Sequence, residues 1–263
     1  MNHAPNLILT TTGPESTVDL LDLISSLKDS DPLTPVTVVG PSVYANLSLR
    51  HGIGRSGFAN VRFMVISRMS ELLGAPLLAE QGRRPLTPIL ETAAVRGVSA
   101  EAQGALHNVR HHPATHASLR SSFRELRYAS NGGLDRLCGQ NDLRREVVRL
   151  YRRFSNVTSD YYDREGLALA AAKAVKAGTA DGLADLGFLV FYQIRDITPA
   201  EREMIEALRE IGQTAIFLGL TGDEEADGPV KRLADKLIGT ATVPAQQSSP
   251  PAEANTRLVI APD

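Results

Sequence analysis

The sequence predicts an α/β protein whose parallel sheet is covered by helices on both faces and interrupted by an inserted helical subdomain. Short, continuously apolar runs alternate with segments of helical periodicity along most of the chain. Continuous apolar runs are typical of strands that are buried on both faces. Their alternation with helices favours parallel pairing. Between residues 86 and 178 the periodicity is helical and no convincing strand is found, which predicts the inserted subdomain.

Six segments are predicted to be strands, because each is short, apolar or β-branched, and bounded by Gly, Pro or polar residues. They span residues 6–12, 36–40, 61–66, 187–192, 214–219 and 257–261. The main helices are predicted at residues 16–28, 43–51, 68–73, 113–130, 134–156, 164–177 and 229–238. Another helix is predicted after Thr198, a good N-cap, because Pro199 suits the first helical position and Glu201 completes a capping box.

This element order divides the chain into an α/β domain, formed by residues 1–84 and 180–240, and a helical insertion at residues 85–179. Residues 241–256 are polar and rich in Pro, Ala, Ser and Gln, which is typical of a linker. The apolar run within residues 257–263 predicts the start of a second domain that is cut short. On physical grounds, an edge strand that returns to the first sheet is an equally good interpretation.

Composition excludes several classes of protein. The 263 residues carry a formal net charge of −2 and contain no apolar run long enough to cross a membrane. The N-terminus has no basic segment followed by a long apolar stretch, so no secretory signal is expected. Cys138 is the only cysteine, which rules out an internal disulfide framework or a cysteine-rich zinc site. We therefore expect a cytoplasmic protein with no membrane partner.

Charge is distributed unevenly along the chain. Residues 110–153 contain ten arginines and four acidic residues, whereas residues 181–236 contain twelve acidic and six basic residues. Two predicted helices carry stripes of arginine at helical spacing, Arg120, Arg124 and Arg127 on one and Arg145, Arg149 and Arg152 on the other. Such stripes can follow a phosphodiester backbone. An ion-paired, solvated helix surface gives the same pattern, so both interpretations stay open.

The turn after the first predicted strand has the position of a phosphate-binding loop, because it leads from a strand directly into a helix. A working loop needs several glycines followed by Lys and then Ser or Thr. Here Ser16 stands where the lysine would be, and Glu15 adds a negative charge. The strand at 187–192 ends without the acidic residue that would hold Mg²⁺. The predicted fold is therefore P-loop-NTPase-like with a degenerate nucleotide loop, formed by Gly13, Pro14, Glu15, Ser16, Thr17 and Tyr192. We expect neither ATP nor Mg²⁺ as a cofactor.

Other catalytic and metal-binding patterns are weak. His112 and His116 are one helical turn apart, but Pro113 lies between them and no Cys or Glu completes a ligand set. The acidic run at residues 221–227 lacks the ligand spacing of a calcium loop. No nucleophile elbow is found. We therefore expect no metal site and no catalytic residue in this chain.

Seven segments along nearly the whole chain carry a resemblance to a known family. In chain order they are ILTTTGPEST, VTVVGPSVYANLSLR, NVRFMVISRMSELLG, HPATHASLRSSFRELR, FLVFYQIRDITPAEREMIEAL, TAIFLGLTGDEEAD and TRLVIAPD. The first three segments resemble, in order, a Walker A loop, the Ia region and a strand that approaches DNA. The fourth resembles an inserted helical subdomain. The last three resemble a Walker B strand with its helix, the next strand and loop, and the opening of a second motor domain. Together they are similar to the N-terminal helicase-like region of AddB-type subunits of RecB-family helicase–nucleases. The PD-(D/E)XK nuclease of that family lies further downstream.

The resemblance implies an inactivated motor, because the Walker A lysine falls on Ser16 and the Walker B acid on Tyr192. It implies a DNA-binding scaffold in a DNA-repair helicase–nuclease that processes double-strand breaks. The exonuclease (hydrolase) activity would lie outside this fragment, in C-terminal domains or in a motor or nuclease partner. Single-stranded DNA or a duplex end would bind beyond the carboxyl ends of the strands. The expected contacts are Arg50, Ser67 and Arg68, with Arg120, Arg124 and Arg127 as a second group.

Two other functions stay open. A small-molecule enzyme on a doubly wound fold would have its site where the loops after the first and fourth strands converge. Only Glu15 and Asp196 offer acid or base chemistry at those loops. A structural partner domain without DNA contact is the other possibility.

Overall fold

The computed structural model describes residues 7–54 and 56–238. The predicted linker and the predicted strand at residues 257–261 lie outside these ranges. Five strands form one parallel sheet: β1 (Leu7–Thr11), β2 (Val36–Gly40), β3 (Val61–Val65), β6 (Phe188–Tyr192) and β7 (Thr214–Leu220). These are the first five strands predicted from the sequence, and the prediction is confirmed for each of them.

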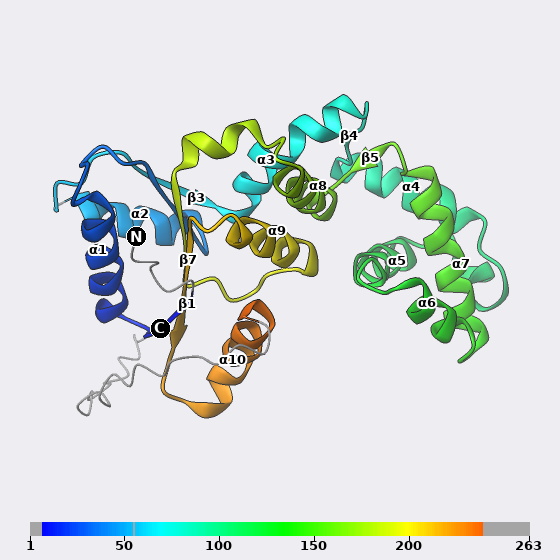
Figure 1. Ribbon diagram of the computed structural model, residues 1–263. Helices are drawn as coiled ribbons and strands as arrows, with labels where there is room; N and C mark the ends of the chain where they lie inside the picture. Colours follow the sequence, from blue (N-terminus) through cyan, green and yellow to red (C-terminus); the bar gives the residue numbers. More distant parts are fainter. Residues whose placement is uncertain (1–6, 55, 239–263) are drawn as a thin grey trace, which may run out of the picture.

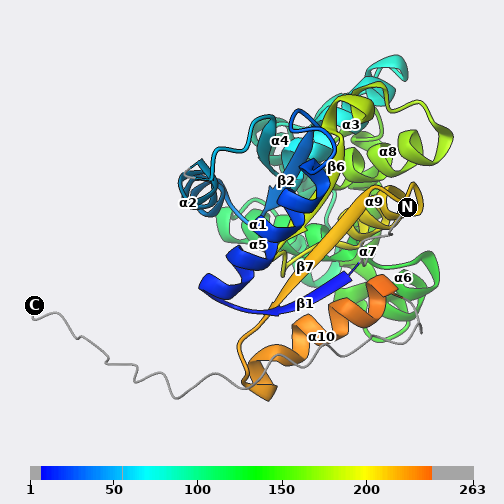
Figure 2. The ribbon, with the colours of Figure 1, turned by 60° about the vertical axis from the view of Figure 1, so that its left-hand side comes forward.

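The strands lie side by side in the order β1-β7-β6-β2-β3, and Figure 2 shows β1 next to β7. Every neighbouring pair is parallel, so all the carboxyl ends meet at one edge of the sheet. The three central strands are almost entirely buried. Burial on both faces explains why these strands are continuously apolar rather than alternating.

Helices cover both faces of the sheet (Figure 1). On one face, α1 (Pro14–Lys28) and α2 (Val43–Gly54) pack against Val190 and Phe217, among others. On the other face, α3 (Ile66–Glu80), α8 (Arg164–Ala177), α9 (Pro199–Glu210) and α10 (Glu224–Ile238) pack against residues such as Phe191. The predicted α/β class with helices on both faces is therefore confirmed. Among the described residues, no helix is both long and apolar enough to span a membrane.

The inserted lobe has a hydrophobic core of its own. It contains α4 (Pro88–Ala100), η1 (Gly104–Val109), α5 (Pro113–Leu126), α6 (Asn131–Cys138) and α7 (Asp142–Val157), and forms the right-hand part of Figure 1. Phe123 and Phe154 lie at the centre of this core with their ring centroids 5.2 Å apart. Two short strands, β4 (Arg84–Pro85) and β5 (Tyr161–Tyr162), pair at the base of the lobe. The sequence did not predict them, since a two-residue strand leaves no periodicity.

The predicted boundary of the insertion at residue 179 differs from the structure, because α8 packs with the α/β domain. Ala171 and Ala172 of α8 are fully buried in the same core as the sheet. A Cβ added to Gly74 of α3 would approach the carbonyl oxygen of Leu167 to 2.3 Å, so the backbones of α3 and α8 touch. The small residues of α8 permit this close approach.

Several helix limits differ from the predicted ones. The single helix predicted at residues 134–156 is two helices, because Asn141 caps α7 through a 2.8 Å hydrogen bond from the backbone amide of Arg144. Helix α3 is longer than predicted and contains Pro76, and α10 begins before Pro229. The capping box predicted for α9 is confirmed. The Thr198 hydroxyl accepts from the amide of Glu201, whose carboxylate accepts from the amide of Thr198.

Candidate functional site

The turn between β1 and α1 meets the end of β6 at the carboxyl edge of the sheet. The backbone amide of Thr12 donates to the Leu220 carbonyl at 2.7 Å. Gly13 follows with a φ of 137°, which favours glycine, and Pro14 opens α1. The strand therefore leads straight into a helix, as the position of a phosphate loop requires.

Ser16 is the centre of a hydroxyl cluster, defined here as Ser16, Thr17, Tyr192 and Gln193. The Ser16 side chain is completely buried and donates to the Gly13 carbonyl at 2.8 Å. Its oxygen lies 2.6 Å from the Tyr192 hydroxyl and 2.6 Å from the Gln193 side-chain nitrogen. Since a serine hydroxyl has one proton and two lone pairs, the consistent assignment has Tyr192 and Gln193 donating to Ser16.

Thr17 and Gln193 also lie within hydrogen-bonding distance of the Tyr192 hydroxyl. The Thr17 hydroxyl lies 3.3 Å from the Tyr192 hydroxyl, and the Gln193 nitrogen lies 3.4 Å from it. Gln193 adopts a positive φ of 50°, which is unusual for a residue other than glycine. Gly219 makes room for it, because an added Cβ would approach the Gln193 side chain to 3.3 Å. Gln193 was not expected from the sequence, because it has no local signal for this role.

Two carboxylates lie along the first turns of α1. Glu15 accepts a 2.6 Å hydrogen bond from the Thr11 hydroxyl, and Asp19 accepts one of the same length from the Thr10 hydroxyl. The hydroxyl cluster itself contains no charged group. Binding of a triphosphate depends on cations and unoccupied donors, whereas here the donors bond to one another and the nearest charges are negative. Gly13, Pro14, Glu15, Ser16, Thr17 and Tyr192 are thus brought together, but in an arrangement that does not favour phosphate.

Ser67 and Arg68 lie in the first turn of α3, directly after β3, and both are exposed. They line a groove of about 500 Å³, whose other side is formed by Tyr162, Asp163 and Arg164. Arg68 forms an exposed ion pair with Glu71 at 2.6 Å. Such pairs contribute little to stability in water. Both residues therefore lie at the carboxyl edge of the sheet, as expected.

Arg50 does not lie where the sequence analysis expected it. It is the eighth residue of α2. Helix α2 must return to the amino end of the sheet so that β3 can run parallel to β2, and seven residues of helix advance by about 10 Å. The expected position of Arg50 at the end of a strand was wrong, because its helix carries it away from that edge.

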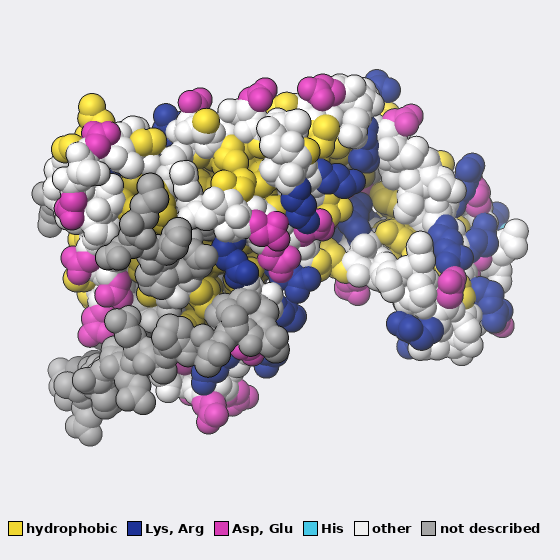
Figure 3. All heavy atoms as spheres, in the orientation of Figure 1, with side chains coloured by type: hydrophobic (Ala, Val, Ile, Leu, Met, Phe, Trp, Pro, Cys, Tyr) yellow, Lys and Arg dark blue, Asp and Glu magenta, His cyan; other side chains and the backbone are white. Residues whose placement is uncertain are grey.

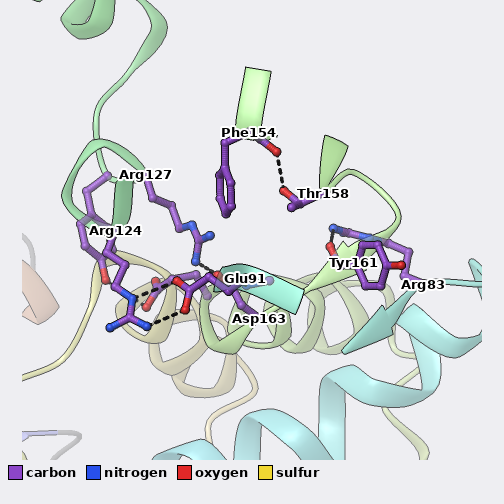
Figure 4. Close-up of polar contacts among 11 residues, drawn as sticks. Arg83, Glu91, Arg124, Arg127, Phe154, Thr158, Tyr161 and Asp163 are labelled. Atoms are coloured by element: carbon purple, nitrogen blue, oxygen red, sulfur yellow. Dashed lines mark hydrogen bonds and ion pairs between the residues drawn. The ribbon is translucent and has the colours of Figure 1, made fainter. Parts of the chain in front are cut away.

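Two arginines of the first stripe, Arg124 and Arg127, form ion pairs with carboxylates of this chain (Figure 4). The Arg124 guanidinium binds both carboxylate oxygens of Glu91 on α4, at 3.1 and 2.7 Å. That hydrogen bonding raises the pKa of Arg124. Arg127 pairs with Asp163, which also caps α8. These two side chains connect α5 to neighbouring elements, as the ion-paired interpretation of the stripe predicts.

Arg120 differs from the other two. Within residues 7–54 and 56–238 its side chain forms no ion pair or hydrogen bond, and it lines a groove of about 380 Å³ between α4 and α5 together with Arg96, His111 and His116. The second stripe is fully paired, by Arg145 with Asp142, Arg149 with Glu146 and Arg152 with Asp135. Of the six arginines in the two stripes, only Arg120 is thus available to an anion without displacing a carboxylate. Arg96 was not expected from the sequence, because it precedes the basic segment at residues 110–153.

Three histidines, His107, His111 and His116, contact Arg110 rather than grouping around a common point, and His112 accepts a hydrogen bond from the Ala114 amide. The Arg110 guanidinium contacts His107 and His111, and His116 bonds to the Arg110 carbonyl at 2.9 Å. In the part of the chain that the structure describes, no three His, Cys, Asp or Glu residues are grouped so as to hold a metal ion.

Comparisons with known proteins identify no relative. No protein-family model matches the chain, and a search of curated proteins finds no significant match. The resemblance to AddB-type subunits therefore stays a prediction from the sequence.

Proposed function

We propose that this protein is a helicase-like DNA-binding scaffold that does not hydrolyse ATP and that acts in a larger DNA-repair helicase–nuclease. The observation that carries the proposal is the contact between Ser16 and Tyr192, 2.6 Å apart. A motor needs a cation and a carboxylate at the two ends of its nucleotide site. Two neutral hydroxyls that are hydrogen-bonded to each other hold the start of α1 against the end of β6. They do not supply the charges that phosphoryl transfer needs.

Two guanidinium groups support DNA as the ligand, one on an exposed residue and one on a half-buried residue. Arg68 lies at the carboxyl edge of the sheet, and Arg120 lies on the inserted lobe without a carboxylate partner among the described residues. Figure 3 shows a hollow between the lobe and the α/β body. Contacts with phosphates need no base-specific geometry, so such a scaffold would bind DNA without sequence preference. A motor or nuclease partner in the cytoplasm belongs to the same proposal.

The small-molecule enzyme has less support. The loops after β1 and β6 do converge, as that alternative requires. However, the polar side chains that meet there are hydroxyls and an amide already bonded to one another. Asp196 is exposed on the loop before α9 and is not hydrogen-bonded to that cluster. No acid–base pair is formed by these groups.

Fluorescence anisotropy of a labelled dT20 oligonucleotide, titrated with the full chain from 50 to 200 mM NaCl, tests the proposal. We expect log K to fall linearly with log[NaCl], with a slope of about −0.7 for each phosphate contacted. ATP turnover measured with and without dT20 is expected to stay at background. The absence of binding at 50 mM NaCl, or ATP hydrolysis that Thr17→Ala abolishes, would contradict the proposal.

A further inference from the structure

A second surface with strong positive charge lies far from the arginine stripes. The start of α9, the loop before it and residues 229–236 of α10 enclose a groove of about 340 Å³. Apolar side chains, including Ile197, Pro199 and Leu233, form part of its lining. Four basic side chains complete that lining, and we call this surface the basic groove: Arg195, Arg202, Arg232 and Lys236.

The basic groove is unexpected for its position in the sequence. Residues 181–236 contain twelve acidic and only six basic residues, yet four of the six basic residues line this groove and no acidic residue does. Asp196 and Asp235 are next to Arg195 and Lys236 in the chain but are not part of the lining. Folding has therefore separated the two signs of charge here.

The cations of the basic groove also lack partners. Among the described residues Arg195, Arg232 and Lys236 form no ion pair. Arg202 has only a 3.5 Å contact between its Nε and Glu206, and this nitrogen is buried without a hydrogen bond. In contrast, six of the ten arginines of residues 110–153 are paired with carboxylates. Like charges repel one another by about 1 kcal/mol at 4 Å in water. An anion bound between these cations would therefore reduce their electrostatic repulsion.

The position of the groove fits a ligand site. Arg195 lies three residues after the end of β6, at the carboxyl edge of the sheet where ligands of open α/β sheets bind, and the groove extends from there along α10, away from that edge. In the view of Figure 3, both Lys or Arg and Asp or Glu side chains lie over the region of α9 and α10. Arg232 and Lys236 are one helical turn apart, or about 5–6 Å between Cβ atoms, so each can contact a different phosphate. The apolar lining can accommodate the sugar between them.

We propose that the basic groove binds the backbone of single-stranded DNA through successive phosphates. This inference rests on the proposed function, and it names a contact surface that contains none of the residues expected from the sequence. Three arginines and a lysine suit phosphate oxygens, since guanidinium groups bind them in a bidentate manner and an ammonium binds them as a point charge.

Two lysines of α10 provide a matched test. Lys236 lines the basic groove, whereas Lys231 of the same helix is exposed but does not line it. We expect Lys236→Gln to weaken binding of labelled dT20 about threefold at 200 mM NaCl and to make the salt slope shallower by about 0.7, the contribution of one phosphate contact. Arg232→Gln combined with Lys236→Gln should weaken binding about tenfold. Lys231→Gln and Lys236→Arg should retain the affinity, and thermal unfolding of each variant verifies folding.

The outcomes separate this inference from the proposed function. If the unmodified chain binds no dT20, both are overturned. If it binds with the expected salt dependence but Lys236→Gln and Lys231→Gln behave alike, only the basic groove is overturned. Should the double variant fail to fold, the comparison of the two single lysine variants still decides between these outcomes.

Discussion

The hydroxyl of Ser16 lies 2.6 Å from the hydroxyl of Tyr192, although the two residues are 176 positions apart in the chain. They occupy the two positions at which the resemblance to a helicase motor expects a lysine and an acid. A fully buried site of two neutral hydroxyls avoids the desolvation of an ammonium and a carboxylate. The contact therefore stabilises the end of the sheet and leaves these two positions without the charges that phosphate chemistry needs.

Tyr192→Phe is expected to lower the free energy of unfolding by about 1 kcal/mol, the usual net contribution of one hydrogen bond. The variant leaves Ser16 bonded to Gly13 and Gln193, so the fold should persist. Urea denaturation followed by circular dichroism measures the change. Tyr44, which is 84% exposed, provides the control, and Tyr44→Phe should have no effect. Equal midpoints for the two variants would argue against a structural role for the Tyr192 hydroxyl.

Ser16→Lys should be strongly destabilising, by about 3–5 kcal/mol, because it buries an ammonium in a fully buried position whose polar groups already bond to one another. Adding Tyr192→Asp supplies a carboxylate at the neighbouring position. We expect a favourable coupling energy of about 0.5–3 kcal/mol between the two substitutions, as found for residues in direct contact. A double-mutant cycle of unfolding free energies measures this coupling. Additive effects would mean that positions 16 and 192 do not face each other.

Arg120 and Arg124 are expected to respond differently to substitution, although they lie on the same helix. Arg120→Gln should weaken dT20 binding about threefold at 200 mM NaCl, the loss expected from one phosphate contact. Arg124→Gln should leave binding nearly unchanged, because Glu91 already neutralises that guanidinium. Its effect should be on stability, at about 0.2–1 kcal/mol. The opposite pattern, with Arg124 controlling affinity, would show that DNA displaces Glu91.

Asp227 makes stability depend on acidic pH. Its buried carboxylate accepts hydrogen bonds from the Thr221 amide, the Thr221 hydroxyl and the Gly222 amide. The backbone hydrogen bond from Thr221 is the main reason that the pKa of Asp227 is lowered from 3.8. A lowered pKa in the folded state stabilises the protein above the unfolded value, and this stabilisation is lost as the pH falls through the folded value.

Asp227→Ala should therefore cost about 1–3 kcal/mol at pH 7 and flatten the loss of stability between about pH 5 and pH 2. Asp235→Ala, an exposed change on the same helix, is the control and should retain the pH profile. Chemical denaturation at several pH values measures both. If Asp227→Ala still loses stability steeply at acidic pH, other carboxylates cause that loss.

The sequence predicted the sheet because its signal is local. A strand such as Val36–Gly40 is buried on both faces, and burial favours a short run of apolar or β-branched residues, a pattern present in the chain itself. The α9 capping box is equally local, since Thr198 and Glu201 are three residues apart. By contrast, the strand Tyr161–Tyr162 is too short for a pattern. The partner of α8 depended on close packing with Gly74 rather than on its own periodicity.

The α/β class and the separation of basic and acidic segments can be read from the sequence alone, as can the absence of a lysine at position 16 and of an acid at position 192. Which of these charges are neutralised depends on how the helices pack. Arg124 and Arg120 are equivalent on a helical wheel, but α4 brings Glu91 to one of them. The basic groove assembles side chains from Arg195 to Lys236 inside an acidic segment. Periodicity is a property of neighbours in the chain, whereas electrostatic pairing depends on distances between elements that only packing fixes.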